Sequence, residues 1–110
     1  MSRHRFYTLN GKVYEPCPPE VAQAQWEDLS QLVLLASTIS EEVSVFTIFL
    51  GIDHRTDQGG PPILFETLVV GGRWDGCYER YTSYETAETR HHQIVSEVHV
   101  TLGQDENRSE

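Results

Sequence analysis

The stretch Val43-Ser-Val-Phe-Thr-Ile-Phe-Leu50 decides the fold, because its apolar side chains occupy both parities of a β-prone run. In an extended chain, odd-numbered positions face one side and carry Val and Phe around Thr47, while positions 46, 48 and 50 carry Phe, Ile and Leu on the other. A strand with two apolar sides is typical of the middle of a sheet. We therefore expect this strand to be central and covered on both sides.

Neighbouring segments extend the pattern to a sheet. Leu32 to Ile39 is apolar and β-branched, and the polar break at Ser40-Glu-Glu42 predicts a hairpin with the central strand. Downstream, Ile63 to Val70 and Tyr78 to Thr82 are two more predicted strands, separated by the turn region Gly71 to Gly76.

The N-terminal region predicts a further hairpin and a short helix. Asn10-Gly11 is typical of a type I′ turn within Phe6 to Glu15, which would place Tyr7 opposite Tyr14. Pro19 suits the first position of a helix that continues through Glu20 to Asp28, and we expect Trp26 to anchor it.

The last helix has the clearest local pattern. Thr82 and Glu85 have the spacing of a capping box, and Gly103 marks the expected end. Apolar and large side chains recur at helical spacing at Tyr84, Ala87, His91, Ile94, Val95, Val98 and Leu102. Together these elements predict an α+β fold, with an antiparallel sheet of about four to six strands, the C-terminal helix on one face and a short N-terminal helix. Residues 1–103 form the expected single domain, and 104–110 a disordered polar tail.

Charge limits the classes of partner. The chain has 17 acidic and 8 basic residues and a formal net charge of −9, so its field repels phosphate backbones and anionic lipid. We expect no direct nucleic-acid or membrane binding, and a protein partner that is basic or itself binds nucleic acid. The sequence leaves the oligomeric state open. With no signal-peptide pattern and with Cys17 and Cys77 isolated, we expect a cytoplasmic protein with reduced thiols.

The residues that could carry chemistry lie around the loop from Gly51 to Pro62. Asp53, His54 and Asp57, with Glu66 on the next strand, offer the carboxylates and imidazole that acid–base catalysis or metal binding uses. The alternative is structural: loop aspartates tighten turns, and Glu66 forms a salt bridge to Arg73 or Arg80 or faces water at a sheet edge. The loop itself is expected to lie on the surface and to be dispensable for folding.

The histidines of the last helix do not predict a metal site. His91 and His92 are about 100° apart around the helix, and His92 and His99 are separated by a rise of roughly 10 Å. His91 falls in the apolar stripe, where a hydrogen-bonded core histidine is expected. We expect no metal and no cofactor.

Aromatic residues near the last predicted turn suggest a contact surface. Trp74, Tyr78, Tyr81 and Tyr84 cluster there, and Tyr and Trp are favoured in protein interfaces, although core packing is the alternative. The candidate partner-binding residues are Trp74, Tyr78, Tyr81, Asp53 and Asp57.

Several strings resemble a group of small uncharacterised phage and prophage proteins. These are Leu9-Asn-Gly-Lys-Val-Tyr14, Phe49-Leu-Gly-Ile-Asp-His54, Gly60-Pro-Pro-Ile-Leu-Phe-Glu-Thr67, Gly71-Gly72 and Arg80-Tyr-Thr-Ser-Tyr-Glu-Thr-Ala87, which span most of the chain. The resemblance implies a mobile-element accessory protein and assigns no catalytic role. The chain departs from that group at Tyr84, where its members often have Trp.

Three functions follow as hypotheses. The first is a non-enzymatic phage-type protein that binds a host macromolecule, for example an inhibitor of a nucleic-acid-processing machine that acts against host defence or mimics nucleic acid. The second is a small metal-assisted or acid–base enzyme that uses Asp53, His54 and Glu66. The third is a structural component of a larger assembly.

Overall fold

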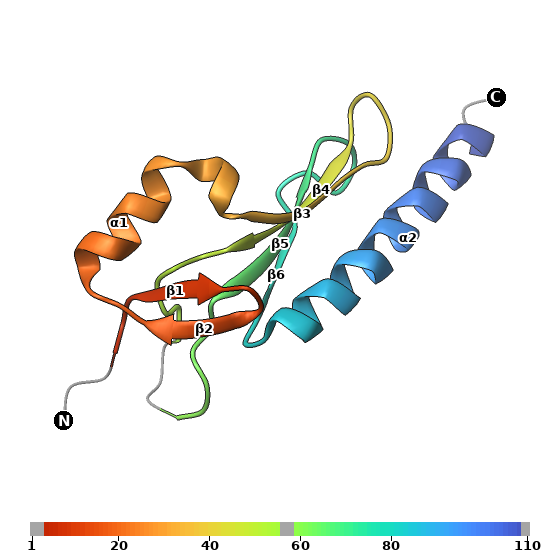
Figure 1. Cartoon of the computed structure of the whole chain (residues 1–110). Helices are drawn as coiled ribbons and strands as arrows, with labels where there is room; N and C mark the ends of the chain where they lie inside the picture. The colour runs from red at the N-terminus through yellow and green to blue at the C-terminus, as the bar shows by residue number, and fades with distance from the viewer. Residues whose placement is uncertain (1–3, 56–58, 109–110) are drawn as a thin grey trace.

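The computed structural model describes residues 4–55 and 59–108, with side chains as far as residue 103. Figure 1 follows the chain from the N-terminal hairpin to the long C-terminal helix. The elements are β1 (Tyr7–Asn10), β2 (Val13–Pro16), α1 (Pro19–Glu27), the 3-10 helix η1 (Leu29–Gln31), β3 (Val33–Thr38), β4 (Ser44–Phe49), β5 (Phe65–Val70), β6 (Tyr78–Tyr81) and α2 (Tyr84–Arg108).

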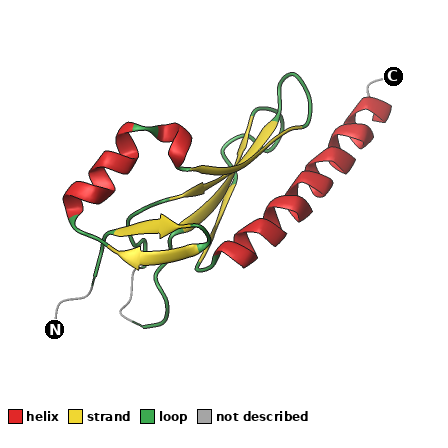
Figure 2. Cartoon of the chain, viewed as in Figure 1, coloured by secondary structure: helices red, strands yellow, loops and turns green. Residues whose placement is uncertain are grey.

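The strands form two antiparallel sheets, one of two strands in the order β1-β2 and one of four strands in the order β3-β4-β5-β6. Figure 2 shows α2 along one side of the four-stranded sheet and α1 beside the hairpin at the other end of the molecule. The α+β class, the antiparallel sheet, the C-terminal helix on it and the short N-terminal helix are thus confirmed.

The core lies between α2, the β1-β2 hairpin and one face of the four-stranded sheet. Toward the hairpin, Phe49 and Phe65 pack with Tyr7 and with Ala87 of α2. Farther along α2, Val45 and Val69 pack with Val98 in a second cluster. The odd-numbered residues of β4 and β5 therefore point into the core, as the period of two requires.

The opposite face of this sheet is not buried as predicted. β4 is central, but its even-numbered side chains Phe46 and Ile48 are only half-buried, and α1 packs mainly on β1 and η1 instead. The expectation that other elements cover both faces of β4 is wrong. The sequence shows that both faces are apolar, but it does not show which elements pack on them. We call this surface the open face, and it consists of Val33, Phe46, Ile48, Leu68, Val70 and Tyr78.

The first hairpin is shifted by one residue from the prediction. Asn10 pairs with Val13, so the central turn residues are Gly11 and Lys12, and only Gly11 has a positive φ, of 64°. Glycine first in a two-residue turn is the type II′ pattern, so the type I′ expectation is wrong. Tyr7 consequently pairs with Pro16, although its ring still meets Tyr14 diagonally, with centroids 5.7 Å apart.

α1 confirms the prediction from Pro19, which occupies the first turn. The Trp26 indole Nε1 donates a hydrogen bond to the backbone oxygen of Leu50 at 3.0 Å, so this residue anchors the helix as expected. Gly51 lies directly beneath the indole with φ +76°, and a Cβ there would stand 3.0 Å from Nε1. A larger residue at position 51 would therefore strain the backbone and press on Trp26.

Both expected ends of the last helix are wrong. The Ser83 hydroxyl, and not Thr82, accepts the capping hydrogen bond from the Thr86 N–H at 3.1 Å, because Tyr81 still pairs within the sheet and the chain turns only afterwards. At the other end, α2 continues through Gly103 to Arg108, since Gly103 does not adopt the positive φ of a helix-ending glycine. The domain boundary expected at residue 103 therefore falls within a helix.

Candidate functional site

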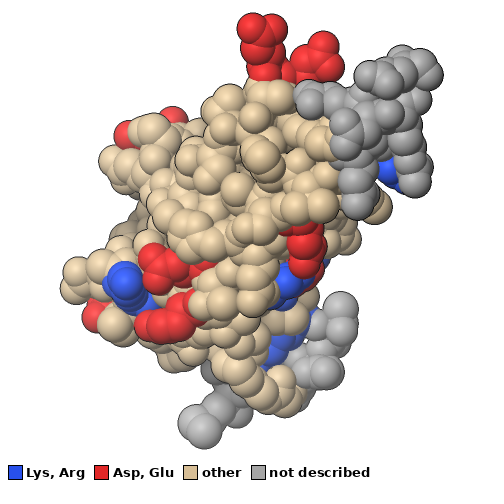
Figure 3. Space-filling model, turned by 90° about the vertical axis from the view of Figure 1, so that its right-hand side faces the viewer, with Lys and Arg blue, Asp and Glu red and all other residues tan. Residues whose placement is uncertain are grey.

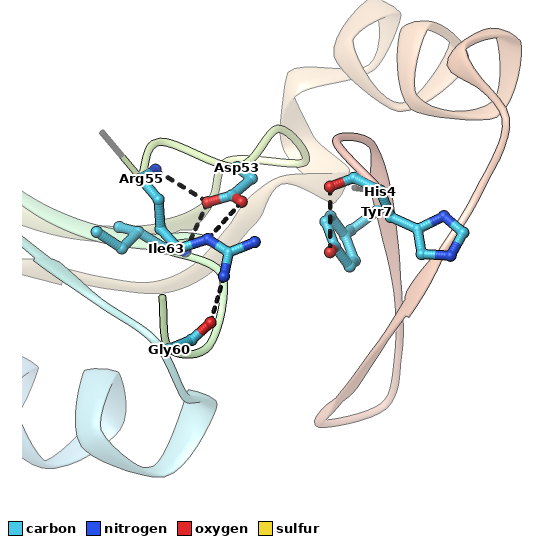
Figure 4. Close-up of polar contacts among 6 residues, drawn as sticks. All are labelled: His4, Tyr7, Asp53, Arg55, Gly60 and Ile63. Atoms are coloured by element: carbon cyan, nitrogen blue, oxygen red, sulfur yellow. Dashed lines mark hydrogen bonds and ion pairs between the residues drawn. The ribbon is translucent and has the colours of Figure 1, made fainter. Parts of the chain in front are cut away.

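Asp53 anchors the long loop. Its carboxylate accepts hydrogen bonds from the backbone N–H groups of Arg55 at 2.9 Å and Ile63 at 3.0 Å, and from Arg55 Nε at 2.7 Å (Figure 4). The Arg55 guanidinium also reaches the backbone oxygen of Gly60. Asp53 is only 6% exposed, so it ties the two ends of the loop together from inside.

The start of this loop is not the surface segment that we expected. The Gly51 oxygen accepts from the Tyr7 N–H, and the Asp53 N–H donates to the Arg5 oxygen, each at 2.9 Å. Both loop residues are buried, because the composition of a turn does not reveal pairing with the distant N-terminal strand. Asp57, another candidate, lies outside the described residues.

His54, Glu66 and Arg80 form the second half of the predicted constellation. Glu66 Oε1 accepts from Arg80 Nε at 3.0 Å, which confirms the salt bridge that the sequence offered as the structural alternative. Burial and the charge of Arg80 lower the pKa of His54, against the opposing influence of Glu66 and Asp53. A neutral imidazole at pH 7 can accept a proton, but both carboxylates are already engaged by cationic or backbone donors.

We expect the Glu66–Arg80 pair to contribute little to stability. The Arg80 side chain is 37% exposed, and a partly solvated pair of this kind is worth about 0.5 to 1 kcal/mol. A double-mutant cycle of Glu66→Ala and Arg80→Ala, measured by urea unfolding, tests this value. The bidentate pair between Arg90 and Glu79 serves as a comparison, and a coupling above about 2 kcal/mol for Glu66 and Arg80 would contradict the prediction.

Metal-ligating side chains do not converge in the described part of the chain. No three His, Cys, Asp or Glu side chains of residues 4–55 and 59–103 lie close enough together to hold an ion. Cys17 and Cys77 are both free thiols. The described residues thus offer no preformed metal centre to a metal-assisted reaction.

His91 is buried under α2, as expected of a core histidine. Its Nδ1 is 2.8 Å from the Thr47 hydroxyl and its Nε2 is 2.9 Å from the Ser37 hydroxyl. Thr47 in turn lies 2.6 Å from the Thr67 hydroxyl. We call Ser37, His91, Thr47 and Thr67 the hydroxyl–histidine chain, which links α2 to three strands of the sheet.

The predicted aromatic cluster divides between the surface and the core. Trp74 and Tyr78 are 42% and 61% exposed, whereas Tyr81 is only 6% exposed and packs with the core. Tyr84 also packs against the core. The aromatic surface thus consists of Trp74, in the turn after β5, and Tyr78, at the start of β6.

A groove lies beside these residues, between the β6 edge of the sheet and the middle of α2. Its volume is about 190 Å³, and it is mostly apolar with charged residues at its rim. We call it the β6–α2 groove, and it is lined by Val69, Trp74, Cys77, Tyr78, Glu79, Arg90, Ile94, Glu97 and Val98. Small-molecule sites usually exceed roughly 300 Å³, so this groove suits one or two side chains of a partner.

The wall of the groove is held by charge pairs. Arg90 on α2 donates to both carboxylate oxygens of Glu79 on β6, at 2.7 and 2.9 Å, and these hydrogen bonds lower the pKa of Glu79. Glu97 lies 3.9 Å from Arg90 with its side chain 67% exposed. The Glu79 carboxylate is thus neutralised by Arg90 within the wall, whereas the Glu97 carboxylate faces solvent at the rim.

Acidic residues on the α2 side are dispersed. Figure 3 shows Asp and Glu side chains in small separate groups, several of them beside Lys or Arg, with a broad neutral surface between them. Among the described residues on this side, the acidic side chains do not form a continuous track. The net charge therefore acts on a partner as a general field more than as a patterned surface.

Comparisons with known proteins identify no relative. No family model, curated protein or solved structure matches the chain. None of the helices in the described ranges offers the long apolar stretch that a bilayer span requires.

The α2 side of the groove was missed by sequence reasoning. Ile94 and Val98 belong to the apolar stripe and were assigned to the core alone, and Arg90 and Glu97 look like ordinary surface charges. The available signal was the apolar stripe, but a stripe does not distinguish a core contact from the wall of a groove. Ile94 and Val98 line the groove because α2 crosses β6, and this crossing is not visible in the sequence.

Proposed function

We propose that this chain is a non-enzymatic binding protein of phage type, which binds a basic host protein in the cytoplasm through the β6–α2 groove. The observation that carries the proposal is Trp74, 42% exposed at the mouth of an apolar groove. A half-exposed Trp beside a pocket of side-chain size is the arrangement in which an interface anchor is usually found.

The character of the partner follows from charge. The chain carries a net charge of −9, and the Glu97 carboxylate lies at the groove rim. A partner segment with an aliphatic or aromatic side chain for the groove, flanked by Lys or Arg, complements both features. Proteins that process nucleic acid have such basic surfaces, and the phage resemblance makes a host protein of that class the proposed partner.

The enzyme alternative has less support. Asp53 is buried and holds the loop, Glu66 is paired with Arg80, and neither carboxylate lines the β6–α2 groove. The binding function instead uses Trp74 and Tyr78, which are exposed and belong to neither core cluster.

We expect Trp74→Ala to weaken partner binding by about 30-fold or more, which corresponds to the 2 kcal/mol of an anchor residue. A displayed peptide library selected against the intact protein provides the probe, and selected peptides should combine apolar and basic residues. Leu29→Ala is the control, because Leu29 is an exposed apolar residue on η1 and does not line the groove.

Salt dependence separates the two contributions to binding. Between about 0.05 and 0.5 M salt the Debye length falls from roughly 14 to 4 Å, so association should slow much more than dissociation accelerates. Trp74→Ala should instead accelerate dissociation. The proposal fails if the selected peptides bind Trp74→Ala as tightly as the unaltered protein.

A further inference from the structure

The open face is an apolar sheet surface that no described element covers. Phe46, Ile48 and Leu68 lie close together on the two central strands and are half-buried. Val70 and Tyr78 extend the surface and are 42% and 61% exposed. Large contiguous apolar patches on a protein surface often mark interaction sites, and the open face has this character.

Charge on this face is balanced within the chain. Its cross-strand pair Glu66 and Arg80 is joined at 3.0 Å, and the Arg80 guanidinium lies over the Tyr78 ring at 4.8 Å from the centroid. The face is thus neutral although the chain carries a net charge of −9. A basic partner would find no unpaired carboxylate on the open face. A second surface that is neutral and apolar would be complementary to the open face.

The chain is elongated, and the 25-residue helix α2 contributes to its length. The molecule measures 61 × 29 × 20 Å, and its Cα radius of gyration is 16.0 Å. A compact chain of this length has a radius of gyration of about 13 Å. Among the described residues, the region of β4 and β5 has two layers, the sheet and α2, so the open face is the outer side of the sheet.

We propose that a second copy of this chain packs its open face against the first, sheet on sheet. A copy supplies a surface of the same width, the same apolar character and the same internally paired charge. A twofold axis through the open face would bring each copy's Phe46, Ile48 and Leu68 against those of the other, since such an interface is self-complementary. Aligned sheets about 10 Å apart would then form the centre of a four-layer dimer, with an α2 helix on each outer side.

This arrangement leaves most of the β6–α2 groove free, although Tyr78 belongs to both surfaces. The core-facing Val69 contributes to the groove, whereas its neighbours Leu68 and Val70 belong to the open face. The groove is therefore on the α2 side of the sheet, and a dimer through the open face would present two grooves on its outer surfaces. Loss of the dimer and loss of partner binding can accordingly be measured separately.

Sedimentation velocity and light scattering of the full chain between about 1 and 200 µM test the proposal. We expect a mass near twice 12.6 kDa at the upper concentrations, and a melting temperature that rises with concentration. Leu68→Glu and Val70→Glu should weaken dimerisation by about 100-fold or more, because each places an unpaired carboxylate within the sheet-on-sheet contact. Circular dichroism verifies that each variant remains folded.

Val100→Glu is the matched control. Val100 is 59% exposed on α2, away from the open face, so the same substitution there should leave the dimer intact. Val70 is already 42% exposed, which keeps Val70→Glu informative if Leu68→Glu unfolds the chain. The proposal is overturned if the unaltered chain is a monomer at 200 µM, if Val70→Glu stays dimeric, or if Val100→Glu dissociates the dimer equally.

Discussion

Replacing Asp53 with Ala is expected to destabilise the folded chain by about 3 kcal/mol or more. The substitution leaves the Arg55 guanidinium, whose side chain is 9% exposed, and the backbone N–H groups of Arg55 and Ile63 without the carboxylate that now satisfies them. A buried cation without its partner and orphaned buried donors are each costly. Urea unfolding monitored by Trp fluorescence measures the loss.

Asp28→Ala is the control for this prediction. Asp28 also accepts a backbone N–H, from Ser30 at 3.2 Å, but it does so on the surface at the start of η1, and its loss should cost about 1 kcal/mol. A loss below about 1 kcal/mol for Asp53→Ala would show that the loop is not held by this carboxylate.

Acid should weaken the same anchor. Burial by itself raises the pKa of the Asp53 carboxyl, but the two backbone donors and Arg55 outweigh burial and hold the pKa below its ordinary value. The stabilisation is therefore fully present above about pH 4, the ordinary pKa of Asp, and is lost as the pH falls through the lower folded-state value.

The second large effect is expected at His91, where His91→Ala should cost about 3 kcal/mol. The substitution removes a large buried side chain and leaves the Ser37 and Thr47 hydroxyls without the imidazole between them. His99→Ala, at an exposed position of the same helix, should change stability by less than about 0.5 kcal/mol. Similar losses for the two variants would refute the role of the hydroxyl–histidine chain.

The stability of the chain should also depend on pH through His91. Burial, and then the nearby charge of His92, lower the pKa of His91 in the folded state. Between that lowered pKa and about 6.5, the unfolded chain binds more protons than the folded chain, so the free energy of unfolding rises with pH and levels off above about 6.5. His54, whose pKa is also lowered, acts in the same direction. His91→Gln should therefore reduce the pH dependence but not abolish it, and an unchanged slope would contradict this assignment.

Local patterns predicted the elements well. The period of two identified β4 and β5, Pro19 marked the start of α1, and the apolar stripe placed His91 in the core. These predictions depend on neighbours in sequence, where propensity and periodicity act directly. The same reasoning failed at Gly11 and Gly103, because a glycine permits a turn or a helix end without requiring either.

The candidate site was less accessible to sequence reasoning. Asp53 was identified as important, but its burial depends on pairing between the loop and residues 5–7, which are distant in sequence. Trp74 was recognised as a surface aromatic, whereas the groove beside it requires the crossing of α2 over β6. Strand alternation places Tyr78 and Tyr81 on opposite faces, but only the register of Tyr81 opposite Phe65 shows that Tyr81 is the one facing the core.

The hydroxyl–histidine chain also determines where α2 rests along the sheet. The apolar side chains Ile94, Val98 and Leu102 recur every four residues, so a slide of one helical turn would replace each by a similar one at modest cost. His91 cannot be replaced in this way, because the same slide would bring Ala87 or Val95 to the Ser37 and Thr47 hydroxyls. The hydrogen bonds of His91 therefore select one position of α2 among several whose apolar packing energies are nearly equal.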